Sequence, residues 1–221
     1  MRFLVRGDAP NCLNLFKHGK DKWSVISQNR KTDEIWQSIN KMQQGFCAYC
    51  ERKLKNNSRS KHLEHFFPRR SNPKLTFSWP NIFGSCSTPN SCGDFKDNNL
   101  EAKKIDLNSV CKPDVDNPEG YLVFLSDGKV RPKHGLGVSD KKKALNTIQV
   151  FNLDEQSKLV NSRHQAIANE KQLADKFWEA MSDNDGSEEW QKILEDERLE
   201  ALTRIESQAH RTALKQLWEF N

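Results

Sequence analysis

The hydrophobic pattern predicts a short helix near the start of the chain. Apolar residues at helical spacing follow Thr32 and Asp33, a pair suited to capping a helix N-terminus. The spaced residues are Ile35, Trp36, Ile39 and Met42. Gly45 is expected to end this helix, whereas residues 1–30 show no sustained period.

Short extended segments are predicted for the middle of the chain. The turn-forming run 56–60 divides residues 47–65 into a knuckle around Cys47 and Cys50, a loop and a strand. A second short segment follows over 79–83, and residues 94–102 favour a helix. Residues 121–131 predict a β-hairpin closed by a proline, because two apolar runs flank an Asp-Gly turn.

Long helices are predicted beyond the hairpin. One is expected to be capped by Asp154 and to end at the turn-forming run 184–187. A last helix is expected from about Glu188 to Phe220, with apolar residues recurring at threes and fours. Neither helix carries evident chemistry, so core packing and a protein interface are the two interpretations.

These elements predict an α+β protein in four segments. Residues 1–45 form an N-terminal segment with a short helix, and residues 46–112 form a cysteine-containing core. Residues 113–153 hold the hairpin and its connection, and residues 154–221 form a helical region. The flanks of the core are therefore expected to be mostly helical.

Composition excludes several classes of protein. The chain has 221 residues and a mean hydropathy of −0.85, but six of its residues are Trp and twelve are Phe, so wholesale disorder is not expected. No apolar run approaches the roughly 20 residues of a membrane-spanning helix, and residues 1–8 do not start a signal peptide. We therefore expect a soluble, cytoplasmic protein without a membrane partner.

The net charge of +5 conceals an asymmetry along the chain. Residues 154–221 carry nine basic and fifteen acidic residues, a net charge of −6, which leaves +11 on residues 1–153. A polyanion would bind the basic part, and its densest stretch is 51–75. On charge alone, a solvated basic surface is the commoner explanation.

Six cysteines are present: Cys12, Cys47, Cys50, Cys86, Cys92 and Cys111. In a reducing cytosol, closely spaced thiols hold metal more often than they form disulfides. Cys47, Cys50, Cys86 and Cys92 therefore predict a four-cysteine structural zinc site, although the second pair is more widely spaced than in a zinc ribbon. A redox pair at Cys47 and Cys50 is the alternative, and Cys111 is an alternative fourth ligand.

A Glu-His pair lies between the two cysteine pairs. If Glu64 and His65 are in a strand, their side chains point to opposite faces, so one can hold a cation while the other accepts a proton. This division of labour suits phosphodiester hydrolysis, in which the attacking water loses a proton and a divalent ion offsets the developing charge. Asn81 is a candidate for holding the imidazole in the required tautomer.

The order of these motifs resembles the HNH endonucleases, over residues 47–96. That family has a ββα-metal fold, in which a hairpin and the following helix bind one divalent ion, frequently beside a four-cysteine zinc site. The resemblance implies that Glu64 is an acidic metal ligand, His65 the general base and Asn81 the residue that orients the base. The catalytic ion would be Mg or Mn.

The third position of the signature departs from the family pattern. Where many members have an Asn or His as second metal ligand, this chain has Gly93, which has no side chain to ligate with. Asp94 is the neighbouring candidate for that ligand and Asp97 the next. His62 is interpreted as a substrate contact or a surface residue, and a position facing the metal is the alternative.

Wider features resemble the HNH subunits of Septu-type and retron-associated antiphage systems, the PtuB family. The resembling segments are 43–51, 63–68 and 144–163, and the similarity extends over most of residues 1–165. It implies a nuclease that works with an ABC/SMC-like ATPase, PtuA, and degrades nucleic acid after phage infection. In retron systems a retron RNA–DNA hybrid would be reached through that ATPase. The helical region 154–221 is a hypothetical docking surface.

Basic side chains near the Glu-His pair predict a non-specific grip on nucleic acid, because phosphate contacts position a backbone without reading its sequence. The predicted contacts are Lys53, Lys55, Arg59, Arg69, Arg70 and Lys96. DNA is the favoured substrate and host tRNA the other candidate. The competing hypothesis is a zinc-containing nucleic-acid-binding adaptor that has lost catalysis, motivated by the glycine at position 93.

Overall fold

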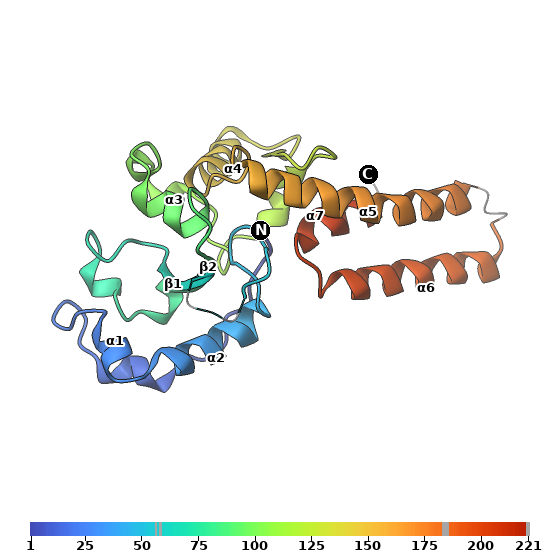
Figure 1. Ribbon diagram of the computed structural model, residues 1–221. Helices are drawn as coiled ribbons and strands as arrows, with labels where there is room; N and C mark the ends of the chain where they lie inside the picture. Colours follow the sequence, from blue (N-terminus) through green and yellow to red (C-terminus); the bar gives the residue numbers. More distant parts are fainter. Residues whose placement is uncertain (56, 58, 183–185, 220–221) are drawn as a thin grey trace.

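The computed structural model describes residues 1–55, 57, 59–182 and 186–219. It is a mixed α+β structure, mostly helical, with two small antiparallel sheets of two strands each (Figure 1). The α+β class expected from the sequence is therefore confirmed. Among the described residues, no helix is long and apolar enough to cross a membrane.

The N-terminal helices lie against the first sheet. Helix α1 (Val25–Gln28) is short, and α2 (Thr32–Gln43) confirms the predicted helix, with Ile35 and Ile39 fully buried. The helix ends because Gln44 and Gly45 both have left-handed backbone conformations, at φ 55° and 80°. Its buried face packs on strand β2 (Ile82–Cys86).

A hairpin and a helix form the centre of the molecule. Strand β1 (Lys61–His65) pairs antiparallel with β2, so that Glu64 lies opposite Phe83 and His65 opposite Ile82. Helix α3 (Cys92–Asn98) follows and packs on β2. The predicted strand and helix are both present in this region, with the helix shorter than the expected 94–102. These three elements form a ββα unit.

The second hairpin comprises β3 (Leu122–Phe124) and β4 (Val130–Pro132). The predicted closing proline is itself in β4, paired with Leu122. Gly128 in the turn has φ 83°, and a Cβ there would lie 2.7 Å from the backbone nitrogen of His164, so both the turn and the close approach require glycine. Helix α4 (Val138–Val150) packs on β4.

The C-terminal helices are α5 (Ser157–Ser182), α6 (Glu188–Ile205) and α7 (Arg211–Lys215). Helices α5 and α6 extend side by side away from the ββα unit (Figure 1). Of the expected break 184–187, residues 184 and 185 lie outside the described residues. Asp154 precedes α5 by three residues, and its carboxylate accepts a hydrogen bond from the backbone nitrogen of Val130 at 2.8 Å.

The prediction of one last helix over 188–220 was wrong. Helix α6 ends at Ile205, and His210 adopts a left-handed conformation with φ 60°. The buried His210 ring contacts the carbonyl oxygen of Cys50 at 3.1 Å and the hydroxyl of Ser162 at 2.9 Å. These contacts turn the chain back, so α7 packs against α5 and against the cysteine knuckle.

Seven short 3-10 helices connect these elements within the described residues. They span Asn11–Leu15, Pro73–Leu75, Trp79–Asn81, Ala102–Lys104, Leu107–Ser109, Pro118–Gly120 and Gln216–Trp218. In the described part of the chain the hydrophobic core has three clusters, centred on the aromatic rings of Tyr49, Phe83 and Phe151, on α2 and Phe77, and on the C-terminal helices. The first cluster includes Leu159 of α5, so contacts cross the predicted boundary at residue 153. The division of the chain into four segments therefore stays a prediction.

Candidate functional site

The four predicted zinc ligands meet in one buried cluster. The ligand atoms of Cys47, Cys50, Cys86 and Cys92 all lie within 4.8 Å of one another. Cys47 and Cys50 come from the knuckle after α2, Cys86 ends β2, and Cys92 begins α3. Among the described residues, this is the one group of three or more His, Cys, Asp or Glu side chains close enough to share an ion.

The geometry of the cluster fits zinc. Tetrahedral zinc with Zn–S bonds of about 2.3 Å requires sulfur atoms about 3.8 Å apart, and the sulfur atoms of Cys50 and Cys86 are 3.8 Å apart. Burial raises the pKa of the Cys92 thiol well above its ordinary value, so a thiolate here needs a nearby cation. Four buried sulfur atoms are the donor set of a closed structural site. The wide spacing of the second pair is accommodated because β2 and α3 each supply one ligand.

The other two cysteines lie outside this cluster. Cys12 is in the first 3-10 helix and packs with the core around α2. Cys111 is buried, and its backbone nitrogen donates to the hydroxyl of Thr147 at 2.8 Å. The cluster is therefore formed by the four cysteines predicted to form it, with Cys111 not replacing any of them.

Glu64 is a buried carboxylate between an ammonium group and an imidazole ring. Only 3% of its side chain is exposed, and the Lys96 ammonium lies 3.0 Å from Oε1 while Nε2 of His62 lies 3.3 Å from Oε2. Burial alone would raise the Glu64 pKa, but His62 and Lys96 outweigh it and lower that pKa. Oε1 accepts no hydrogen bond of good geometry from the described residues. It therefore has capacity for a further electrophilic partner.

Gly93 gives the Glu64 carboxylate its space. A Cβ at position 93 would overlap the carboxylate, lying 2.6 Å from its carbon atom. The backbone nitrogen of Gly93 faces the hydroxyl of Ser85 on β2, at 3.3 Å. The glycine at the third signature position therefore has a steric reason, because α3 approaches β1 too closely for a side chain there.

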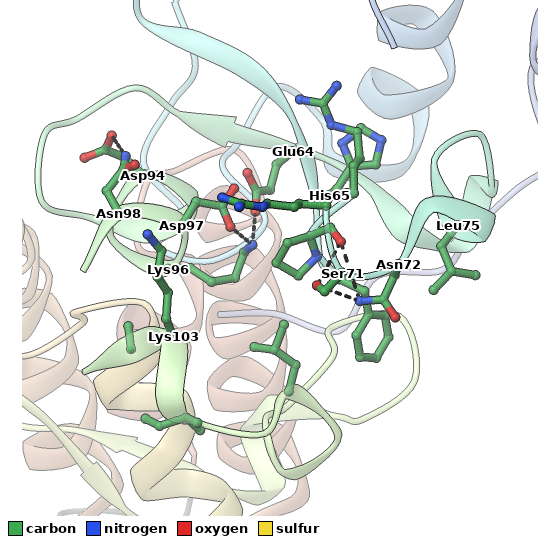
Figure 2. Close-up of a pocket in the computed structure, with 18 of the residues that line it drawn as sticks. Glu64, His65, Ser71, Asn72, Leu75, Asp94, Lys96, Asp97, Asn98 and Lys103 are labelled. Carbon is green, nitrogen blue, oxygen red and sulfur yellow. Dashed lines mark hydrogen bonds and ion pairs between the residues drawn. The ribbon is translucent and has the colours of Figure 1, made fainter. Parts of the chain in front are cut away.

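The two candidate second ligands are placed differently. Asp94 accepts hydrogen bonds from the backbone nitrogen of Asn90 and from the side chain of Asn98, each at 2.9 Å. Asp97 contacts the same Lys96 ammonium that contacts Glu64. Figure 2 shows this difference, with Asp94 beside Asn98 and apart from the group formed by Glu64, Lys96 and Asp97. The structure thus brings Asp97, and not Asp94, to the ammonium beside Glu64.

His65 is held as a neutral imidazole, and its Nδ1 has no hydrogen-bond partner among the described residues. Its Nε2 lies 2.9 Å from the carbonyl oxygen of Thr76, which can only accept, so Nε2 carries the proton and Nδ1 keeps its lone pair. The indole of Trp23 packs edge-on against the imidazole, with ring centroids 4.4 Å apart. Burial lowers the His65 pKa to about 4, although the hydrogen bond that the ring donates to the Thr76 carbonyl raises it. The ring is therefore uncharged at neutral pH.

Asn81 braces the loop that carries Thr76. Its Oδ1 accepts from the backbone nitrogen of Phe67 at 2.8 Å, and its Nδ2 donates to the carbonyl oxygens of Phe67 and Leu75. These bonds tie both ends of the loop together. In the structure the group in contact with the His65 ring is the Thr76 carbonyl, one residue beyond the Leu75 carbonyl that Asn81 holds.

Glu64 and His65 both line an open cleft of about 1680 Å³. Among the predicted nucleic-acid contacts, Arg69, Arg70 and Lys96 also line it, and Lys53, Lys55 and Arg59 do not. Arg69 and Arg70 are exposed, whereas Lys96 is buried against Glu64. The cleft therefore combines acidic side chains, a neutral imidazole and a basic rim. Figure 2 labels Glu64, His65 and Asp97 among the residues that line it.

Sequence reasoning missed two partners of His65. The Thr76 carbonyl is a backbone group, which leaves no signature in a sequence. Trp23 is an aromatic residue from a segment 42 positions earlier with no helical or strand period, so only the fold shows that it reaches the imidazole. His62 was predicted as a substrate or surface contact, and it lies beside the Glu64 carboxylate.

Comparison with known proteins gives a distant relative. The chain is similar to the Septu protein PtuB of Bacillus thuringiensis, with 28% identity over 117 residues. The matched segment covers 53% of this chain and 40% of that protein, so the chain matches less than half of its relative's length. The chain matches no known family profile. The expected resemblance to Septu PtuB is therefore confirmed as a distant similarity.

Proposed function

We propose that this protein is a metal-dependent HNH endonuclease that hydrolyses phosphodiester bonds, as a subunit of a bacterial antiphage defence system. The observation that carries the proposal is the ββα unit, which holds a buried carboxylate and a neutral imidazole on adjacent residues of one strand, beside a four-cysteine cluster. Similarity to a Septu protein supports the biological setting.

The donor set around Glu64 fits a hard divalent cation. Glu64 and Asp97 both contact the Lys96 ammonium, so their carboxylate oxygens face the same point. Mg and Mn prefer carboxylate oxygens as ligands. Glu64 is the proposed first ligand and Asp97 the better-placed second one. Asp94 would first have to give up its hydrogen bonds to Asn90 and Asn98. When bound, the ion would offset the negative charge that develops on the phosphate and the leaving oxygen.

His65 is the proposed general base. Its free Nδ1 is the atom that would take the proton from the attacking water, while the Thr76 carbonyl keeps the proton on Nε2 and fixes the ring. Asn81 is a positioning residue, because it holds the loop and not the ring. We therefore expect Asn81→Ala to lower kcat with little change in KM, as steady-state cleavage assays would measure.

The basic rim is proposed to hold the substrate backbone. Arg69 and Arg70 are the principal phosphate contacts, since they are exposed at the cleft that contains Glu64 and His65. Further phosphate contacts outside the cleft would come from Lys53, Lys55 and Arg59. Such contacts make affinity fall steeply with salt and carry no sequence information. DNA is the favoured substrate, with host tRNA as the second candidate.

An ABC/SMC-like ATPase of the PtuA type is the proposed partner, and a retron RNA–DNA hybrid would be contacted through it. The pair α5 and α6 is the proposed docking surface, because it extends away from the ββα unit (Figure 1). Helix α7 is less suitable, since it is already packed on the cysteine knuckle.

One observation favours a second candidate function, a nucleic-acid-binding adaptor without catalysis. The ammonium of Lys96 already provides a positive charge 3.0 Å from Glu64. In this alternative, the Lys96–Glu64 pair is a structural ion pair and the cleft only binds phosphate.

A cleavage assay separates the two functions. The protein, His65→Ala and the exposed-histidine control His134→Ala are incubated with plasmid DNA, single-stranded DNA and tRNA, with Mg or Mn and with EDTA. The nuclease predicts metal-dependent cutting that falls by about 10²- to 10⁴-fold in His65→Ala and persists in the control. If no variant cuts, even with the ATPase partner and ATP present, the adaptor is the correct function.

A further inference from the structure

A second groove adjoins the cleft along strand β1. It encloses about 590 Å³, within the range of small-ligand sites, and His62 and Leu63 line both hollows. Its far side is lined by Trp23, just before α1, and by α2, which contributes Trp36 and the exposed amides of Gln37 and Asn40. The groove is thus aromatic inside and polar at its rim.

The two tryptophans of this groove differ from the tryptophans of the core. Trp79, Trp178 and Trp218 each donate a hydrogen bond from the indole nitrogen, at 2.9 Å in every case. The indole nitrogens of Trp23 and Trp36 donate to no described residue. Both rings are half-buried, so they keep aromatic surface and a polar donor at the groove.

Cations and the candidate base surround these rings. The Lys61 ammonium lies over the Trp36 ring, 4.3 Å from its centroid, and the Arg69 guanidinium lies 5.7 Å from that of Trp23. Trp23 also packs edge-on against His65. A nucleotide next to a phosphate bound at His65 would therefore reach the groove directly, with a basic residue near each aromatic ring.

Building on the proposed nuclease function, we propose that this groove binds an unpaired nucleobase adjacent to the scissile phosphate. Every base has an aromatic face that stacks on tryptophan, whatever its identity. In a duplex those faces are covered by neighbouring bases, so only a single strand, a loop or an extruded base can enter. The enzyme would therefore act on single-stranded or locally unpaired DNA or RNA.

Binding measurements without added Mg or Mn test this site independently of cleavage. The probes are ten-nucleotide oligo-dT and oligo-U strands and a ten-base-pair duplex, titrated against the full chain and Trp36→Leu. We expect Trp36→Leu to bind single strands about tenfold more weakly, equivalent to about 1.4 kcal/mol, and the duplex within twofold of the parent. The control Trp190→Leu, on α6, should bind all probes like the parent.

Two results would overturn the proposal: unchanged single-strand binding in Trp36→Leu, or an equal loss for strand and duplex. Comparison of the dT and U arms shows whether a DNA or an RNA strand binds more tightly. If Trp36→Leu does not fold, photocrosslinking of the parent to a 5-iodouracil strand replaces it, with adducts expected on Trp23 or Trp36. Adducts confined to the Arg69–Asn72 loop would contradict the site.

The outcomes for the groove and for the nuclease are distinguishable. If the parent cuts nothing but single-strand binding depends on Trp36, the nuclease proposal fails and the groove stands. If the parent cuts single strands and Trp36→Leu cuts them equally well, the nuclease stands and the groove fails.

Discussion

Two candidate metal sites adjoin each other at the start of α3, where Cys92 belongs to one and the neighbouring Gly93 lies against Glu64 of the other. They differ in how completely the protein encloses them. The four-cysteine cluster is closed, because its sulfur atoms are buried and spaced for one tetrahedral ion. The Glu64 site is open, because its carboxylate borders a cleft and its nearest cationic partner is the Lys96 side chain. A closed set of ligands stabilises a fold, whereas an open one leaves room for a substrate.

The largest effect should come from breaking the closed site. Cys47→Ser removes one thiolate of four, and we expect loss of zinc and of cooperative folding of the ββα unit, because structural zinc contributes its binding free energy to folding. Zinc content and chemical denaturation measure this. Cys12→Ser is the control, since Cys12 is buried outside the cluster. A zinc-free but cooperatively folded, active Cys47→Ser protein would contradict the site.

A substitution at the open Glu64 site should lower the stability of the fold less than Cys47→Ser does. Lys96→Met leaves the Glu64 carboxylate buried without its ammonium, and we expect a loss of about 3 kcal/mol of unfolding free energy. Adding Mn should restore part of that loss. Lys104→Met is the control, because Lys104 pairs with Glu101 on the surface, where such pairs contribute about 0–1 kcal/mol. Equal losses in both variants would show that Glu64 is not a buried, charge-dependent site.

A single methyl group tests the space around Glu64. Gly93→Ala places a Cβ against the carboxylate, and we expect it to cost about 1–3 kcal/mol of stability and to lower metal-dependent cleavage. Gly120→Ala is the matched control, because a Cβ there meets no atom within 4 Å. Thermal unfolding and cleavage rates of both variants measure the effect. Full activity of Gly93→Ala would show that the carboxylate can move without loss.

The smallest effect concerns the contact between α7 and the closed site. Glu51, next to Cys50, accepts hydrogen bonds from the backbone nitrogen and the hydroxyl of Thr212, at 2.8 and 2.6 Å. Burial would raise the Glu51 pKa, but the Met1 amino group and these bonds lower it to about 2. Thr212→Val removes one of these hydrogen bonds and should cost about 1 kcal/mol. The nearly isosteric change should leave zinc content unaltered, and a loss of zinc would mean that α7 supports the cluster directly.

Local sequence patterns were enough to predict the elements whose contacting residues are close together in the sequence. Helical spacing located α2, and the Asp-Gly turn located the hairpin of β3 and β4. The cysteine pairs identified the cluster, because two pairs of closely spaced cysteines are a typical set of zinc ligands. The long helix predicted over 188–220 failed for the opposite reason, since the break at His210 depends on Cys50, 160 residues away.

The sequence by itself determined the α+β class, the four-cysteine cluster and the adjacent carboxylate and imidazole, because each depends on residue type and short spacing. Only the tertiary structure showed that the Thr76 carbonyl contacts the imidazole, that Gly93 makes room for Glu64, and that Asp97 shares the Lys96 ammonium with Glu64. It also brought Trp23 and Trp36 to one groove beside the cleft. These depend on backbone groups and on close approach between separate elements, which side-chain patterns along a chain do not encode.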